Sequence, residues 1–113
     1  MPPESPLPPH MFLVLLALNA GPSHGYGIKK AVAERSDGSV DLDAGGLYRL
    51  IARLEEWGWA ETVDAPEADA DPRRKYYALT TGGQAVLRRE ARRVASLARD
   101  PDVAALAEAP SGG

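Results

Sequence analysis

The strongest constraint on the fold is a change of hydrophobic period near residue 58. Before it, apolar residues recur at intervals of three and four, which places them on one face of an α-helix. These residues are Leu47, Leu50, Ile51, Leu54 and Trp57. After it, "WAETV" at 59–63 alternates, with Trp59, Glu61 and Val63 on one side, and "RKYYAL" at 74–79 predicts a second strand. The intervening "DAPEADADP" is acidic and contains prolines, so a helix is expected to lead directly into a β-hairpin.

Two helices are expected before this unit. The first runs from about His10 to Leu18 and ends at "GP", residues 21–22. Ser23 can cap the second, which runs to about Arg35 before an Asp-Gly turn. Ile28 and Val32 are expected to face inward, whereas Tyr26 is as consistent with the core as with the surface.

The third helix has clear boundary signals. Asp43 is placed to cap its start, and Gly58 suits the left-handed conformation that ends it. Its polar face is unusual because it combines glycine, tyrosine and arginine. The outward residues are Gly45, Tyr48, Arg49, Ala52, Arg53 and Glu56.

A fourth helix is expected to follow the hairpin and to run to about Arg99. Thr81 lies three residues before Gln84, a capping-box spacing, although Thr80 can serve instead. A narrow apolar stripe of the kind that seeks a partner helix is formed by Leu87, Ala91, Val94 and Ala98. Asp100 and Pro101 either stop this helix or begin a last short one through Ala109.

The expected architecture is α+β, mostly α. The chain divides into a proline-rich mobile tail at 1–9, a domain at 10–79, the fourth helix at 80–99 and a short helix or tail at 100–113. Three short helices followed by a β-hairpin are typical of a winged helix-turn-helix. In that fold the third helix enters the DNA major groove and the hairpin forms the wing.

Charge leaves a nucleic-acid partner open. The 113-residue chain has a formal charge of −3, but acids crowd residues 64–71, whereas residues 73–99 hold eight Lys or Arg and one acid, Glu90. A protein that is acidic in total can still present one basic face. Arg88, Arg89, Arg92 and Arg93 are expected on the outer face of the fourth helix, where they serve solubility.

Other classes of protein find little support. There is no cysteine, which fits a reducing cytoplasm, and the apolar run Met11–Leu18 is too short to span a bilayer and follows no basic segment. The two histidines are far apart, and no nucleophile motif or glycine-rich phosphate loop is present, so neither an enzyme nor a cofactor is expected. His24 is interpreted as structural or capping, and Trp57 and Trp59 as core residues.

Three stretches together resemble a known family. "HGYGI" at 24–28, "GGLYRLIARLEEWGW" at 45–59 and "RRKYYALTTGG" at 73–83 look like the three signature blocks of the PadR family of bacterial transcriptional regulators, in the same order and spacing. The similarity covers about residues 10–99, and the single C-terminal helix resembles the smaller subfamily. One departure is Gly46, where the family often carries Thr or Ser, so a phosphate contact from a hydroxyl there is in doubt.

The resemblance implies a homodimeric DNA-binding repressor that a small molecule, such as an aromatic effector, or a stress signal often releases from DNA. It also implies a dimer in which the C-terminal helix packs on the N-terminal helix of the mate, through Leu13, Leu16, Leu87, Ala91, Val94 and Ala98. The residues expected to contact DNA are Tyr26, Lys29, Gly45, Gly46, Tyr48, Arg49, Arg53, Arg73, Arg74 and Lys75.

Physical reasons support several of these contacts. Two glycines let a phosphate approach the positive start of the third helix, although the Asp43 carboxylate competes for the same N–H groups. Arginine on a recognition helix matches the paired acceptors of guanine, with Arg49 favoured over Arg53. The alternatives are a winged-helix interaction module that does not bind DNA and a dimeric sensor of small ligands.

Overall fold

The computed structural model describes residues 2–71 and 73–110. Its elements are α1 (Pro9–Asn19), β1 (Ser23–His24), α2 (Gly25–Arg35), α3 (Ala44–Glu56), β2 (Ala60–Val63), β3 (Tyr76–Leu79), α4 (Thr81–Ala98) and α5 (Pro101–Glu108). The predicted α+β, mostly helical architecture is confirmed, with every expected helix present. The parts of the predicted tails and loop at residues 1, 72 and 111–113 lie outside the described residues.

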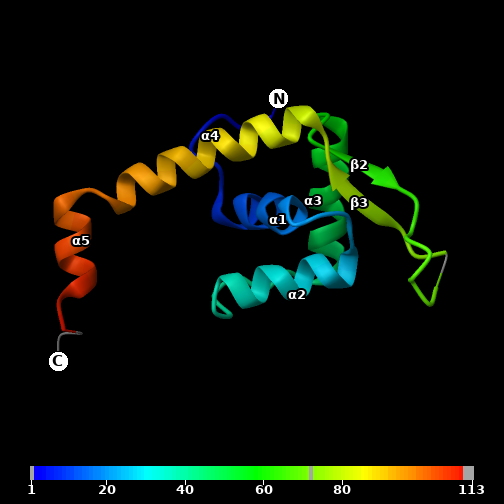
Figure 1. The fold of residues 1–113 in the computed structure, drawn as a ribbon, viewed down its shortest axis with the longest axis horizontal. Helices are drawn as coiled ribbons and strands as arrows, with labels where there is room; N and C mark the ends of the chain where they lie inside the picture. The colour runs from blue at the N-terminus through cyan, green and yellow to red at the C-terminus, as the bar shows by residue number, and fades with distance from the viewer. Residues whose placement is uncertain (1, 72, 111–113) are drawn as a thin grey trace.

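The core lies where α1, α2 and α3 meet under the sheet and the first half of α4. Val14 and Leu15 of α1 and Ile28 and Val32 of α2 are fully buried, and Leu54 of α3 joins them. Figure 1 shows α1 between α4 and α2, with α3 crossing at the end near the wing. The apolar stripe of α3 therefore faces this core, and its polar face is left outside, as the period of three and four predicts.

The sheet has three strands rather than the two expected. Its order is β1-β3-β2, and both pairs are antiparallel. Ser23 pairs with Tyr77 and His24 with Tyr76, so the segment just before α2 is tied to the wing. Two residues carry no visible period, which is why the pattern missed β1. Burial along β2 departs from the strict alternation expected for residues 59–63. Trp59, which lies just before the strand, and Ala60 are both buried, while Glu61 is exposed.

Helix caps were predicted with mixed success. Asp43 and Gly58 are confirmed: the Asp43 carboxylate accepts from the Gly46 N–H, and Gly58 has φ +77°. The prediction that Ser23 caps α2 is wrong, because Ser23 belongs to β1 and the cap is His24, whose Nδ1 accepts from the Gly27 N–H at 3.0 Å. Of the two threonines it is Thr80 that caps α4, since its hydroxyl oxygen accepts from the Gly83 N–H at 3.0 Å.

The N-terminal segment differs from the predicted mobile tail. Leu7 is buried in the core, and Pro9 already belongs to α1. The Ser5 hydroxyl and the Leu7 N–H donate to the two carboxylate oxygens of Glu90, at 2.8 and 3.1 Å. The proline content predicted a mobile tail, but hydrogen bonds to Glu90 on α4 hold this segment against the core.

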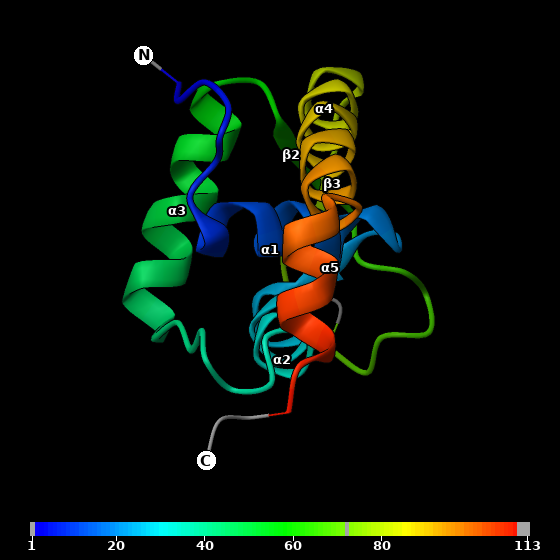
Figure 2. The same ribbon diagram turned by 90° about the vertical axis from the view of Figure 1, so that its left-hand side faces the viewer.

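The end of the chain forms an arm. Asp100 caps α5 by accepting from the N–H groups of Asp102 and Val103, so the short helix is the alternative that the structure adopts. Figures 1 and 2 show α4 running out beyond the core and α5 turning away from its end. No residue of α5 is buried within this chain.

Candidate nucleic-acid interface

On the outer face of α3, the side chains of Tyr48, Arg49 and Arg53 make no intramolecular hydrogen bond or ion pair in the described residues. Glu55, nearer the end of the helix, accepts from the Thr62 hydroxyl at 3.0 Å. Tyr48 is 50% exposed, and Arg49 and Arg53 are exposed without a hydrogen bond or ion pair to the rest of residues 2–71 and 73–110. Neither Glu34 nor Glu56 forms an ion pair with these two arginines. The predicted exposure of this face is confirmed, and two guanidinium groups remain available on it.

The glycines at the start of α3 leave room for the Arg49 side chain. A β-carbon at Gly45 would lie 3.2 Å from an Arg49 guanidinium nitrogen, and one at Gly46 would lie 3.0 Å from Asp43 Oδ1. Because the Gly46 N–H is already bound by Asp43, the helix start is only partly open to an anion. The positive charge of Arg49 lies over it instead.

Beside α3 is an open cleft of about 450 Å³. Its lining comes from the start of α2, from α3 and from the base of the wing: His24, Gly25, Tyr26, Tyr48, Arg74, Lys75 and Tyr77. Tyr26 is 72% exposed, so of its two expected positions the core is excluded. Sequence reasoning brought Tyr26, Tyr48, Arg74 and Lys75 together correctly but left out His24 and Tyr77, whose position depends on the unrecognised pairing of β1 with β3.

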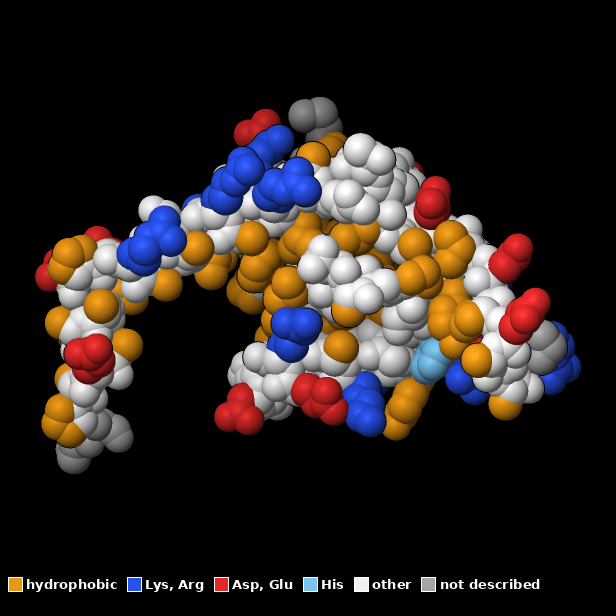
Figure 3. Space-filling view, in the orientation of Figure 1, with side chains coloured by type: hydrophobic (Ala, Val, Ile, Leu, Met, Phe, Trp, Pro, Cys, Tyr) orange, Lys and Arg blue, Asp and Glu red, His pale blue; other side chains and the backbone are white. Residues whose placement is uncertain are grey.

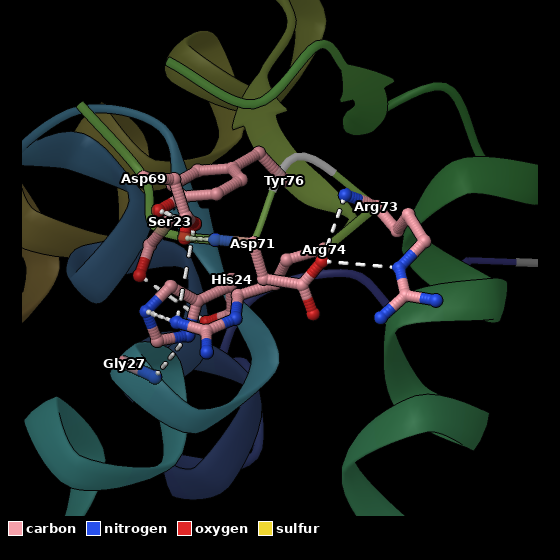
Figure 4. A network of polar contacts seen from close by, with 8 residues as sticks. All are labelled: Ser23, His24, Gly27, Asp69, Asp71, Arg73, Arg74 and Tyr76. Carbon is pink, nitrogen blue, oxygen red and sulfur yellow. Dashed lines mark hydrogen bonds and ion pairs between the residues drawn. The ribbon is translucent and has the colours of Figure 1, made fainter. Parts of the chain in front are cut away.

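The cations of the wing base are partly neutralised by the acidic loop. Arg73 Nε lies 3.3 Å from Asp71 Oδ1, and Arg74 Nη1 lies 3.9 Å from Asp69 Oδ2. Figure 4 shows this network of polar contacts. Acids of the loop therefore lie beside the basic residues at the base of the wing. They hold the arginines, whereas Lys75 has no ion pair within the described chain.

One carboxylate of this network is held by a tyrosine. The Tyr76 hydroxyl donates to Asp69 Oδ2 at 2.6 Å, and the Asp71 N–H donates to Asp69 Oδ1 at 2.8 Å. The Tyr76 hydrogen bond, then that from Asp71, lowers the pKa of Asp69, and the same Tyr76–Asp69 bond raises the pKa of Tyr76. Asp69 therefore stays ionised and fixes the loop to β3.

Two other predicted cations are paired. Lys29 lies 3.4 Å from Asp41, and Arg93 makes a 2.7 Å ion pair with Glu90. Arg93 therefore differs from the solvated arginine expected there, because it forms an ion pair with an acid that is only 2% exposed. Arg88, Arg89 and Arg92 are exposed on α4, where Figure 3 shows a group of basic side chains.

The apolar stripe of α4 has two parts. Leu87 is buried in the core of its own chain and leaves little surface for a partner. Ala91 and Ala98 are exposed, and Leu13 and Leu16 of α1 are partly buried. Further out, Val94 is 38% exposed and Leu97 55%, and on α5 Val103 and Leu106 are exposed as well. We call Val94, Leu97, Val103 and Leu106 the apolar arm face.

Three helices, an exposed cationic face on the third and a β-hairpin beside it define a winged-helix protein of the class that regulates transcription. The chain belongs to the transcriptional regulator PadR-like family, whose model matches residues 14–89. The family resemblance drawn from the sequence is thus confirmed.

Individual proteins are similar to the chain as well. An uncharacterized 37.1 kDa protein in transposon Tn4556 of Streptomyces fradiae is 39% identical over 85 residues, which are 75% of this chain and 23% of that protein. The chain therefore spans about a quarter of the length of this curated relative. A PadR family transcription regulator from Clostridium difficile is 29% identical, with TM-score 0.63, over 79% of this chain and 93% of that one.

A third similarity concerns the fold alone. PadR from Bacillus subtilis, solved in complex with operator DNA, is 20% identical, with TM-score 0.58, over 69% of this chain and 44% of that one. In the described part of the present chain, none of the helices has the length and apolar character needed to cross a membrane.

Proposed function

We propose that this regulator acts in the bacterial cytoplasm as a homodimeric repressor that binds a near-palindromic operator. Each subunit inserts α3 into the major groove, and the two grooves lie about one helical turn apart. Arg49 contacts base edges with Arg53 as its neighbour. The phosphates are contacted by side chains around this helix, namely Tyr26, Lys29, Tyr48, Arg73, Arg74 and Lys75. Gly45 and Gly46 let the backbone of the duplex approach the start of α3.

The observation that carries this proposal is the unpaired cationic face of α3. An arginine that is buried or simply solvated does not require a tyrosine and two glycines beside it. A surface that binds a polyanion must allow close approach, and these residues provide that. Tyr48, Arg49 and Arg53 lie outside the core, and none of them makes an intramolecular hydrogen bond or ion pair in the described residues. The Bacillus subtilis PadR, which shares this fold, was solved with operator DNA.

The dimer is supported by the arm. A helix whose apolar residues are exposed gains stability only by covering them, and α5 buries nothing inside its own subunit. The apolar arm face, with Ala91 and Ala98, is the surface proposed to meet Leu13 and Leu16 of a second copy. A two-fold pair of subunits would match a palindromic site.

Release from DNA would act through α4. This helix joins the arm to the winged core at Thr80, whose hydroxyl donates to the Gly58 carbonyl at the end of α3. A small aromatic molecule that binds near the dimer centre would change the angle between the α3 helices of the two subunits through this connection. Quenching of Trp57 and Trp59 fluorescence by candidate phenolic ligands tests this part.

The decisive experiment is selection of DNA fragments by the purified protein, followed by binding measurements on the enriched duplex and on a scrambled one. We expect one enriched near-palindrome, and an affinity that falls steeply as salt rises from ~50 to ~200 mM because phosphate contacts release counterions. If no duplex is bound at ~50 mM salt, the proposal is wrong and an interaction module remains. If promoter reporters rise rather than fall with the protein, the repressor role is wrong.

A further inference from the structure

The contact between His24 and Arg74 joins two hydrogen-bond donors. Arg74 Nη1 lies 3.4 Å from His24 Nε2, and Figure 4 shows the two groups side by side between the start of α2 and the wing. His24 Nδ1 accepts from the Gly27 N–H, so in the neutral imidazole the proton is on Nε2. The Arg74 guanidinium likewise carries only donors and no acceptor. The two groups therefore cannot satisfy each other.

The imidazole is held in this orientation from two sides. The Tyr26 ring stacks nearly parallel to it, with centroids 6.3 Å apart, and the Tyr76 ring meets it edge-on at 5.3 Å. With Gly27 fixing Nδ1, the plane and the free N–H of His24 are set before any ligand arrives. Such preorganisation lowers the entropy lost on binding.

The nearest acid does not supply the missing acceptor fully. Asp69 already accepts from Tyr76 and Asp71, and its Oδ2 is 3.9 Å from Arg74 Nη1. Both donors line the 450 Å³ cleft, together with Lys75 and the phenols of Tyr26 and Tyr48. The arrangement thus offers several donors to a group that accepts from more than one side.

We infer that His24 Nε2–H and the Arg74 guanidinium together bind one backbone phosphate of DNA, and that His24 is a positioning residue for the duplex as well as a helix cap. This inference rests on the proposed DNA binding and deepens it. The tetrahedral phosphodiester has two unesterified oxygens, which can accept from both donors while Tyr26 and Tyr48 border them. A phosphate here locks the start of α2 and the wing against the same strand.

The test separates capping from phosphate binding. Asparagine is among the best N-cap residues, so His24→Asn keeps the bond to Gly27 but lacks the donor that reaches the cleft. We expect His24→Asn to weaken binding to the enriched duplex by about tenfold, with an unchanged midpoint of thermal unfolding. Arg74→Gln should also weaken binding and reduce the salt slope by about one. The double variant should lose less than the product of the two single losses, because both residues hold one phosphate.

A second measurement uses the unaltered protein. Replacing single phosphates of the duplex by neutral methylphosphonates should reveal one position per half-site whose loss weakens the wild type more than it weakens either His24→Asn or Arg74→Gln. If His24→Asn binds within twofold of the wild type, or if the single losses multiply, the shared phosphate is refuted while DNA binding stands. If the wild type binds no duplex at ~50 mM salt, the proposed function and this inference fall together.

Discussion

The phenol of Tyr48 on α3 lies directly over Gly25, the first residue of α2. A β-carbon at Gly25 would be 2.5 Å from the Tyr48 hydroxyl oxygen and 2.9 Å from Cζ, so the missing side chain is what lets the ring rest there. Gly25 is buried by this contact, while Tyr48 stays half exposed at the edge of the cleft. The two motifs "HGYG" and "GGLY" thus meet in space.

This contact predicts that Gly25→Ala displaces the Tyr48 ring without harming the fold, since alanine is acceptable in the first turn of a helix. DNA affinity should fall by about 1 kcal/mol, roughly fivefold, the typical value of one hydrogen bond. Fluorescence anisotropy and thermal unfolding measure the two effects. In a Tyr48→Ala background the same change should cost nothing further, and an equal loss there would show that Gly25 acts in another way.

The exposed guanidinium of Arg49 leads to a prediction about specificity. Arg49→Ala should weaken binding to the enriched duplex by about 1–3 kcal/mol, while binding to a scrambled duplex changes much less, because base recognition is lost and most phosphate contacts remain. Titrations of both duplexes measure this. Arg92→Ala, an exposed arginine on α4, is the matched control. Equal losses on both duplexes would mean that Arg49 contacts only phosphate.

The apolar arm face predicts how to make a monomer. Val94→Asp with Leu97→Asp places charges on a face that is exposed in one subunit, so the fold should survive while the dimer dissociates. Arg92 lies about 200° around the helix from Val94, which makes Arg92→Glu the control for an added charge. Sedimentation velocity reports the assembly. A dimer that persists in the double variant would refute this interface. Deleting residues 84–113 is less clean, because it also removes Leu87 and Glu90 from the core.

Glu90 predicts a dependence of stability on acid. The hydrogen bonds from Arg93, then those from Ser5 and Leu7, outweigh desolvation and lower the pKa of Glu90 from 4.5 to about 2. Because the pKa of Glu90 is lower in the folded state, its ionised form stabilises the fold at pH values above about 4.5. This contribution is lost as the pH falls from 4.5 to about 2.

The variant Glu90→Gln isolates this contribution. At neutral pH it should lower the free energy of unfolding by roughly 1–3 kcal/mol, since hydrogen bonds to a charged group are lost. The difference from the wild type should shrink through the acid range, as urea titrations at several pH values would show. A difference that stays constant down to the lowest pH would contradict the assignment.

Two adjacent glycines at the start of α4 form a natural pair of tests. A β-carbon at Gly83 would collide with the carbonyl oxygen of Trp59, a backbone atom that cannot rotate away, whereas one at Gly82 would lie 3.4 Å from the Gly58 oxygen. Gly83→Ala should therefore destabilise the protein by about 1–3 kcal/mol, as overpacking does, while Gly82→Ala changes little. Thermal unfolding compares them. Similar midpoints for both variants would show that α4 is not seated on Trp59.

Elements whose signals lie within a few residues of one another could be predicted from the amino-acid sequence. Leu47, Leu50, Ile51 and Leu54 required a helix with one buried face, which by exclusion left Tyr48, Arg49 and Arg53 outside. Asp43 and Gly58 marked its ends because capping chemistry acts within a few residues. The linked motifs at 24–28, 45–59 and 73–83 were sufficient for the family.

Contacts between residues far apart in the chain depend on how the elements pack together. The pairing of β1 with β3 brings His24 to Tyr76 and Arg74, fifty positions later, and turns a cap into part of a cleft. The packing of residues 5–7 on Glu90 turns an apparent tail into part of the core, and Leu87 of α4 is buried in the same core. Such contacts join side chains far apart in the chain, and neither hydrophobic period nor propensity carries information about them. They arise when the helices and the hairpin bury their apolar faces together.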